Sequence, residues 1–259
     1  MTLLTEPTRI VLRNTWQPMD TDAAAYITAV ETADGQALEE KTKIAIDNFV
    51  LGCKQDGIWT AIKASCILSG ARTLVGALIP LAGTAPTNFN FVDGDYNRKT
   101  GLVGDGSTKY LSSNRNNNAD PRNNKHLSTY ITATATVGGD FLSSGIGVGH
   151  SRLTSNINAL LAVINTSIQY VGASAPLGFA GASRSISTSY DVRDDSITFT
   201  QTAGSTNPQN SIISVFNRAS ASGYVDARLA FYSIGESLDL ARLDARVTDL
   251  INAFAVTIP

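Results

Sequence analysis

The sequence predicts a mainly β protein in which the strands of a sandwich or barrel are flanked by helices. Only 16% of the residues are charged, and the polar remainder is rich in Ser, Thr, Asn and Gly, which is typical of strand faces and turns. Short apolar and aromatic segments alternate with turn-forming residues through the middle of the chain, most densely in residues 79–113. Helical periodicity is confined to the two ends.

Composition and charge argue against several classes of function. The 259 residues carry a formal net charge of -2, which gives no electrostatic footprint for nucleic acid or for an anionic membrane surface. No apolar run reaches the roughly 18 residues that a membrane span needs. The first residues lack the basic and apolar segments of a secretory signal. The length suits one large β domain, or one domain with an added helical piece.

The two cysteines, Cys53 and Cys66, are too few for a disulfide framework. Neither has a His or Cys neighbour at metal-ligand spacing. We expect two buried free thiols, with a single bridge as the alternative. No metal or cofactor is expected.

Residues 1–20 are predicted to form an extended arm. Residues 9–13 favour a strand, and Pro7 and Pro18 limit regular structure on either side. This strand belongs either to the edge of its own domain or to the sheet of a neighbouring subunit. In the second case the docking residues are Arg9, Ile10, Val11, Leu12, Arg13 and Trp16.

Two helices are predicted within residues 21–66, as a hairpin that leads into the sheet. The first covers residues 23–33 between an acidic N-cap at residues 20–22 and the stop at Gly35. The second covers residues 37–54, and its apolar residues fall on one stripe that packs against the β domain or, as the minority interpretation, binds a partner. Residues 64–68 enter the sheet.

Residues 67–236 are predicted to form the sandwich. Residues 74–81 are apolar and belong to this strand-and-turn pattern, whereas the Asn-rich residues 114–125 indicate a long solvated loop. Asp194 and Asp195 are predicted to form a turn between two strands. The later strands are expected at residues 126–137, 140–148, 159–164, 167–171, 185–192, 196–200, 211–217 and 227–234.

The last segment, residues 237–259, is predicted to be a helix packed on the sandwich. Its start can be capped by Ser237 or Asp239. Its apolar residues Leu240, Leu243, Val247, Leu250, Ile251 and Phe254 recur at helical spacing.

The motifs that catalysis would need are not found. Glycoside hydrolysis on a sandwich needs two carboxylates clustered on one strand face, and the acidic residues of the β region form no such cluster. The two histidines, His126 and His150, are isolated in sequence, and no nucleophile-elbow or phosphate-loop motif accompanies them. We therefore expect a protein that is not an enzyme.

Two segments are candidates for contact with a glycan or a partner protein. The first comprises Asp93, Asp95, Tyr96 and Asn97. The run from Asp93 to Asn97 carries oxygen ligands at alternate positions, as a calcium loop would, but the distal Glu of an EF-hand is missing and a turn is favoured. The second segment is the Asn-rich loop, with Arg115 and Asn117. A plain solvated loop is the alternative there.

The chain resembles a group of tailed-bacteriophage structural proteins that carry a concanavalin A-like (laminin-G/glucanase-like) jelly-roll sandwich. The resemblance spans roughly residues 22 to 255 and leaves the arm outside. It rests on the helical front DAAAYITAVETADGQALEEKTKIAIDNFVLGCKQDGIW, the link PLAGTAPT, and the pieces GLVGDGSTKYL and FYSIGESL before the last helix.

The resemblance implies an antiparallel jelly roll used in a virion, as a head decoration, collar or tail-associated subunit that docks on other virion proteins and is oligomeric. The acidic cluster of the related glucanases is missing, which implies no hydrolysis. The alternative is a tail or receptor-binding module that grips a host surface glycan.

Overall fold

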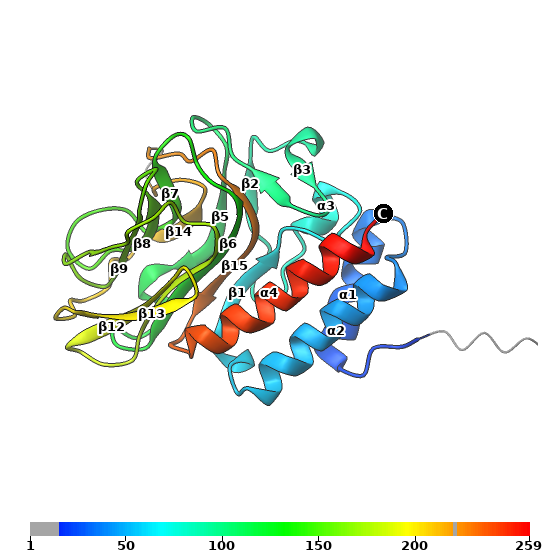
Figure 1. Ribbon diagram of the computed structural model, residues 1–259, viewed down its shortest axis with the longest axis horizontal. Helices are drawn as coiled ribbons and strands as arrows, with labels where there is room; N and C mark the ends of the chain where they lie inside the picture. Colours follow the sequence, from blue (N-terminus) through cyan, green and yellow to red (C-terminus); the bar gives the residue numbers. More distant parts are fainter. Residues whose placement is uncertain (1–15, 220–221) are drawn as a thin grey trace, which may run out of the picture.

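The protein is built in three layers: a layer of helices, an eight-stranded antiparallel sheet and a seven-stranded antiparallel sheet (Figure 1). The computed structural model describes residues 16–219 and 222–259. The antiparallel sandwich with helices at both ends, predicted from the sequence, is confirmed. The described part contains no helix with the length and apolar character of a membrane span.

The eight-stranded sheet carries the helices on its outer face. Its path is β13 (Ile197–Thr202), β12 (Ser189–Asp194), β11 (Gly178–Arg184), β6 (Lys125–Ala133), β15 (Arg228–Gly235), β4 (Gly101–Val103) and β3 (Tyr96–Asn97), and β1 (Ile62–Ile67) also pairs with β15.

The seven-stranded sheet lies on the side remote from the helices. Its order is β10 (Tyr170–Val171), β9 (Leu160–Ile164), β8 (Ser151–Ser155), β7 (Gly139–Ser143), β14 (Ile212–Val215), β5 (Tyr110–Asn116) and β2 (Thr87–Phe89). Consecutive strands β4, β5, β6 and β7 alternate between the two sheets, so the sheets are held together by the chain as well as by their shared core.

Strand periodicity explains the core between the sheets. Leu127 and Ile131 of β6, and Leu153 of β8, point to the inner faces and are fully buried. Burial of one such side chain contributes about 1.5–3 kcal/mol relative to leaving it exposed. The residues that alternate with them face the other side of each sheet, which is the helical layer for the eight-stranded sheet and the free face for the seven-stranded sheet.

The helical layer consists of α1 (Thr21–Asp34), α2 (Glu40–Gln55) and α4 (Leu240–Thr257), with a second apolar core beneath it. Phe49 of α2 meets Phe231 of β15 edge to face, with ring centroids 5.9 Å apart. Asp20 caps α1 by accepting the amides of Asp22 and Ala23 at 2.9 and 3.2 Å. The predicted helix positions, including the C-terminal helix, are confirmed.

Three sequence predictions about the β region need correction. Residues 74–81 do not continue the strand pattern, because Thr73 accepts the Gly76 amide at 3.2 Å and starts the short helix α3 (Leu74–Ala77). The strands β8 and β11 were not predicted. Their Ser, Gly and Ala residues carry little strand signal, and burial between neighbouring strands fixes them instead.

The third correction concerns residues 114–125, which are only in part a solvated loop. The segment continues β5 and turns through a short 3-10 helix (Asn117–Ala119). Asn117, Asp120 and Lys125 are almost completely buried. They are polar residues that pair with each other in the interior, so composition alone gave the wrong exposure.

Two smaller predictions are confirmed. Cys53 and Cys66 are both buried and unbridged. Asp195 and Ser196 have φ values of 48° and 58° and form the two-residue turn between β12 and β13. Most of the predicted arm, including its docking residues Arg9 to Arg13, lies outside the described residues. Trp16 lies inside them and is half-buried.

Candidate functional site

In the first segment predicted for glycan or partner contact, three of the four side chains are already engaged by other groups of the protein. Asp93, Asp95, Tyr96 and Asn97 lie where the chain enters and forms β3. Asp95 pairs with Lys109 at 2.5 Å, and the Tyr96 hydroxyl donates to the Ala71 carbonyl at 2.8 Å. Asn97 accepts two backbone amides of the following turn at 2.9 and 3.1 Å. In the part of the chain that the structure describes, no group of three His, Cys, Asp or Glu residues is placed to hold a metal ion.

Arg115 and Asn117 belong to a buried polar network on the other side of the molecule. Arg115 pairs with Asp120, with Nε 3.1 Å from the carboxylate, and Lys125 donates to the Asn117 carbonyl at 2.9 Å. Burial opposes ionisation of Asp120, but bonds from Arg115 and the charge of Lys125 keep the pKa of its carboxyl below the ordinary value. Burial lowers the pKa of Lys125 to about 8. The network holds the end of β5 against β6.

A different surface is hollowed: it is a groove on the outer face of the seven-stranded sheet. We call it the sheet groove. It has a volume of about 320 Å³ and is lined by residues of β2, β5 and β14 and of the segment after β14. Figure 1 shows where these three strands lie in the seven-stranded sheet. The sheet groove is lined by Phe89, Tyr110, Ser112, Ile212, Ser214, Asn217 and Ala219.

An aromatic pair forms one wall of the sheet groove. Phe89 of β2 and Tyr110 of β5 are cross-strand partners, and their rings are stacked with centroids 4.3 Å apart and planes within 2°. Tyr224 supports the Tyr110 ring edge-on at 6.2 Å. Phe89 remains 37% exposed. The pair is therefore a braced aromatic surface that still faces solvent.

The floor of the sheet groove is polar. Ser112 and Ser214 are directly opposite each other on β5 and β14, and both face outward. Asn217 follows β14 and is only 1% exposed, and its Oδ1 has no hydrogen-bond partner. A buried amide oxygen without a partner is unusual in a folded protein and is costly unless a water or ligand satisfies it. The groove thus combines an aromatic wall with hydroxyl and amide groups.

A buried charged cluster adjoins this groove on β7 and β8. Asp140 is fully buried and accepts from Arg218 Nε at 2.8 Å, and Thr154 donates to its other oxygen. His150 immediately precedes β8. Burial lowers the pKa of the His150 imidazole. Both oxygens of Asp140 are therefore engaged by side chains of the protein.

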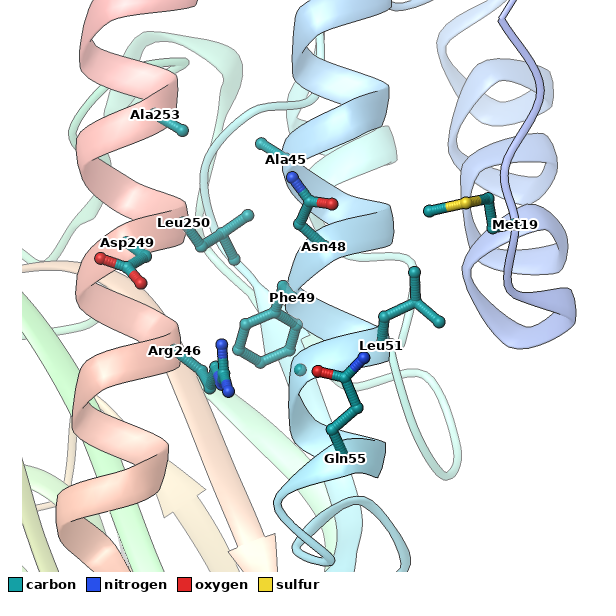
Figure 2. A pocket seen from close by; sticks show the side chains of 11 residues that line it. Met19, Ala45, Asn48, Phe49, Leu51, Gln55, Arg246, Asp249, Leu250 and Ala253 are labelled. Atoms are coloured by element: carbon teal, nitrogen blue, oxygen red, sulfur yellow. The ribbon is translucent and has the colours of Figure 1, made fainter.

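A second hollow, of about 430 Å³, lies between α2 and α4 (Figure 2). Phe49 points into the gap between the two helices, and Arg246 of α4 lies beside it. Gly52 leaves room for this guanidinium, since a Cβ there would come within 2.7 Å of Arg246 Nε. Arg246 is engaged by Asp56 at 2.7 and 3.2 Å. The ion pair between Arg246 and Asp56 therefore joins the two helices beside the hollow.

The sequence contained only part of the signal for the sheet groove. Phe89 and Tyr110 stand out as aromatic residues in short strands, but the sequence around them does not indicate that their strands pair in the register that sets them opposite each other. Asn217 comes from a separate part of the chain. The residues predicted from sequence, Asp93 to Asn97, Arg115 and Asn117, do not line this groove.

Comparisons with known proteins assign no family. No protein-family model and no curated protein sequence matches the chain. Among solved structures, the chain is similar to a mutant of Trypanosoma rangeli sialidase displaying trans-sialidase activity, with 12% identity over 80% of this chain and 39% of that one, and a TM-score of 0.47. It is also similar to the binding domain of botulinum neurotoxin serotype D, with 10% identity over 73% of this chain and 50% of that one, and a TM-score of 0.46.

A third similar structure is domain 4 of AbnA, a GH43 extracellular arabinanase from Geobacillus stearothermophilus, in complex with arabinotriose. The identity is 12% over 64% of this chain and 82% of that one, and the TM-score is 0.38. The chain spans only 39% and 50% of the sialidase and toxin structures. These likenesses are to β-sandwich structures and assign no ligand, activity or partner. The bacteriophage resemblance stays a prediction.

Proposed function

We propose that this protein is a non-enzymatic glycan-binding module and that the sheet groove holds the saccharide. The observation that carries the proposal is the juxtaposition of an exposed, braced aromatic pair with two serine hydroxyls and an unpartnered amide oxygen. Binding sites of this kind combine apolar or aromatic walls with a few placed polar groups.

A sugar ring has the two surfaces that this groove matches. The C–H groups of a pyranose present an apolar patch that packs on an aromatic face, and the hydroxyls at its rim both donate and accept hydrogen bonds. Phe89 supplies the aromatic surface, and Ser112, Ser214 and Asn217 supply the polar partners. A water held by the buried Asn217 Oδ1 would satisfy this acceptor and bridge it to a saccharide hydroxyl. None of the residues that line the groove is charged, which favours a neutral saccharide.

Binding without hydrolysis is part of the proposal. A glycosidase needs two carboxyl groups about 5–9.5 Å apart around the scissile bond. No Asp or Glu lines the groove, and the neighbouring Asp140 has both oxygens engaged. Incubation with neutral polysaccharides should release no reducing sugar above a blank. Release that persists in a Phe89→Ala variant would place an enzymatic site elsewhere and contradict this part.

The experiment is a glycan-array screen followed by calorimetry with the best soluble oligosaccharide. Phe89→Ala should weaken binding about five- to tenfold, because stacking on an aromatic ring is worth on the order of 1–1.5 kcal/mol. Phe199→Ala is the matched control: this phenylalanine is 39% exposed but belongs to the eight-stranded sheet. A monovalent sugar excludes avidity effects. If no array glycan binds, or if both variants bind equally, the proposal is wrong.

We further propose that the module is carried on a bacteriophage particle, docked on other virion proteins. The support is the sequence resemblance, whose GLVGDGSTKYL and FYSIGESL pieces contain β4 and the end of β15. Mass spectrometry of purified particles tests whether the protein is part of the particle. Deletion of residues 1–15 tests the arm, because it leaves the Asp20 cap of α1 intact. A shortened protein that still enters particles normally would exclude docking through the arm.

A further inference from the structure

The strand β13 ends the eight-stranded sheet with an unprotected edge. In the described part of the chain it pairs only with β12, and its outer edge faces solvent. Five of its six residues are exposed, including Ile197 at 54% and Phe199 at 39%. The strand ITFTQT carries no charge, proline or bulge, the devices that usually protect an edge from pairing with another chain.

The other described edges differ from β13. β3 and β10 have two residues each, and β2 has three. The free side of β1 is partly covered by a bridge between Ser65 and Ala82. β13 therefore offers the longest open row of backbone donors and acceptors among these edges.

The backbone of β13 shows which groups are free. The Ala203 amide donates to the Thr188 carbonyl at 2.9 Å, so the groups of Ala203 point toward β12. Backbone groups of successive residues in a strand point to opposite sides. Those of Ile197, Phe199 and Gln201 therefore also point toward β12, while Thr198, Thr200 and Thr202 direct theirs to the free edge. Gln201 Nε2 donates to the Thr202 carbonyl at 3.1 Å, as expected for an outward carbonyl.

We infer that two copies of this chain dimerise by antiparallel pairing of β13 with β13, around a two-fold axis at Phe199. This register keeps matching sheet faces together and places Thr198 opposite the partner's Thr200 as a hydrogen-bonded pair. The two Phe199 side chains meet at the axis, and Ile197 lies opposite Gln201. The eight-stranded sheets would then form one continuous sheet.

A second copy is favoured over other occupants by charge and chemistry. The strand places no charged residue on the shared edge, so the two-fold operation brings no like charges into opposition. Cross-strand pairs of aromatic and β-branched residues are those that stabilise antiparallel sheets. The strand predicted for residues 9–13 is the competing occupant, and it would bring Arg9 and Arg13 into the pairing.

The test is light scattering coupled to size exclusion over a series of protein concentrations. The wild type should reach twice the 27.4 kDa of one chain. Thr200→Pro removes an outward amide that β12 does not use, so the monomer should fold normally while the dimer dissociation constant rises at least about tenfold. Thr200→Val keeps that amide and should still dimerise.

A cross-link tests the register. Phe199→Cys should give a disulfide-linked dimer under air oxidation, because non-hydrogen-bonded antiparallel partners bring their Cβ atoms close. The native thiols are buried and do not compete. Thr198→Cys, with its side chain on the opposite sheet face and no self-pairing at the axis, is the control and should not link.

Three results would overturn the inference. One is a monomer at all concentrations. Another is a dimer that Thr200→Pro leaves unchanged. The third is a dimer that disappears on deletion of residues 1–15, which would mean that the arm of a second copy, and not its β13, pairs with the β13 edge. None of these outcomes depends on glycan binding.

Discussion

Protonation of one buried histidine should weaken the fold as the pH falls below neutral. His126 lies at the start of β6 and is fully buried. Its Nδ1 is 2.5 Å from the Glu236 carbonyl oxygen and its Nε2 is 2.6 Å from Ser233 Oγ. A carbonyl can only accept, so Nδ1 carries the proton of the neutral ring and Nε2 accepts from the serine hydroxyl. Both ring nitrogens of the neutral imidazole therefore have a hydrogen-bond partner.

Burial lowers the pKa of His126 from an ordinary 6.5 to about 4, because the charged form loses its hydration. The nearby charges of Asp120, Lys125 and Arg115 partly cancel. Between these two pH values the unfolded chain binds a proton that the folded chain does not, so the free energy of unfolding falls as the pH falls. At about 1.4 kcal/mol per pKa unit, the loss from pH 6.5 to 4 is about 3 kcal/mol.

The assay is urea unfolding at several pH values, followed by circular dichroism, for the wild type and for His126→Asn. The asparagine keeps an amide donor near the Nδ1 position but does not titrate, so the variant should be less stable at pH 7 and should lose less stability on acidification. The titrations of His150 and the carboxylates are common to both proteins and cancel in the difference. Parallel stability curves between pH 6.5 and 4.5 would refute the reasoning.

Three further predictions concern the helical layer and the thiols. Asp20→Ala should destabilise the protein by about 1–2 kcal/mol in urea unfolding, through loss of the α1 cap, and Asp20→Asn, which keeps an acceptor, should cost less. Gly70→Ala should cost about 2 kcal/mol or more, because its φ is 86° and a Cβ would lie 2.7 Å from the Phe254 ring. Gly35→Ala has a similar φ but open space and should cost less; equal losses in thermal unfolding would exclude the clash. Burial raises the pKa of both cysteine thiols to about 12, so neither should react with a thiol reagent at pH 8 until the protein unfolds; fast reaction of the native protein would contradict their burial.

Features that depend on neighbours in sequence were predictable. The stripe of α4, the cap at Asp20 and the turn at Asp195 are local, since they depend on helical spacing, a side-chain acceptor and positive φ values within a few residues. The alternation of strands and turns identified the sandwich for the same reason. The low charge followed directly from composition.

The tertiary structure alone decided where polar residues lie and which strands meet. Within the Asn-rich residues 114–125, Asp120 and Lys125 are buried because Asp120, Arg115 and Lys125 compensate each other's charges, and composition does not encode that pairing. The sheet groove exists because the register sets Phe89 opposite Tyr110 and brings Asn217 to the same surface. Periodicity tells which face of a strand is apolar, but sheet pairing is a non-local choice made by the whole core, and the candidate site depends on that choice.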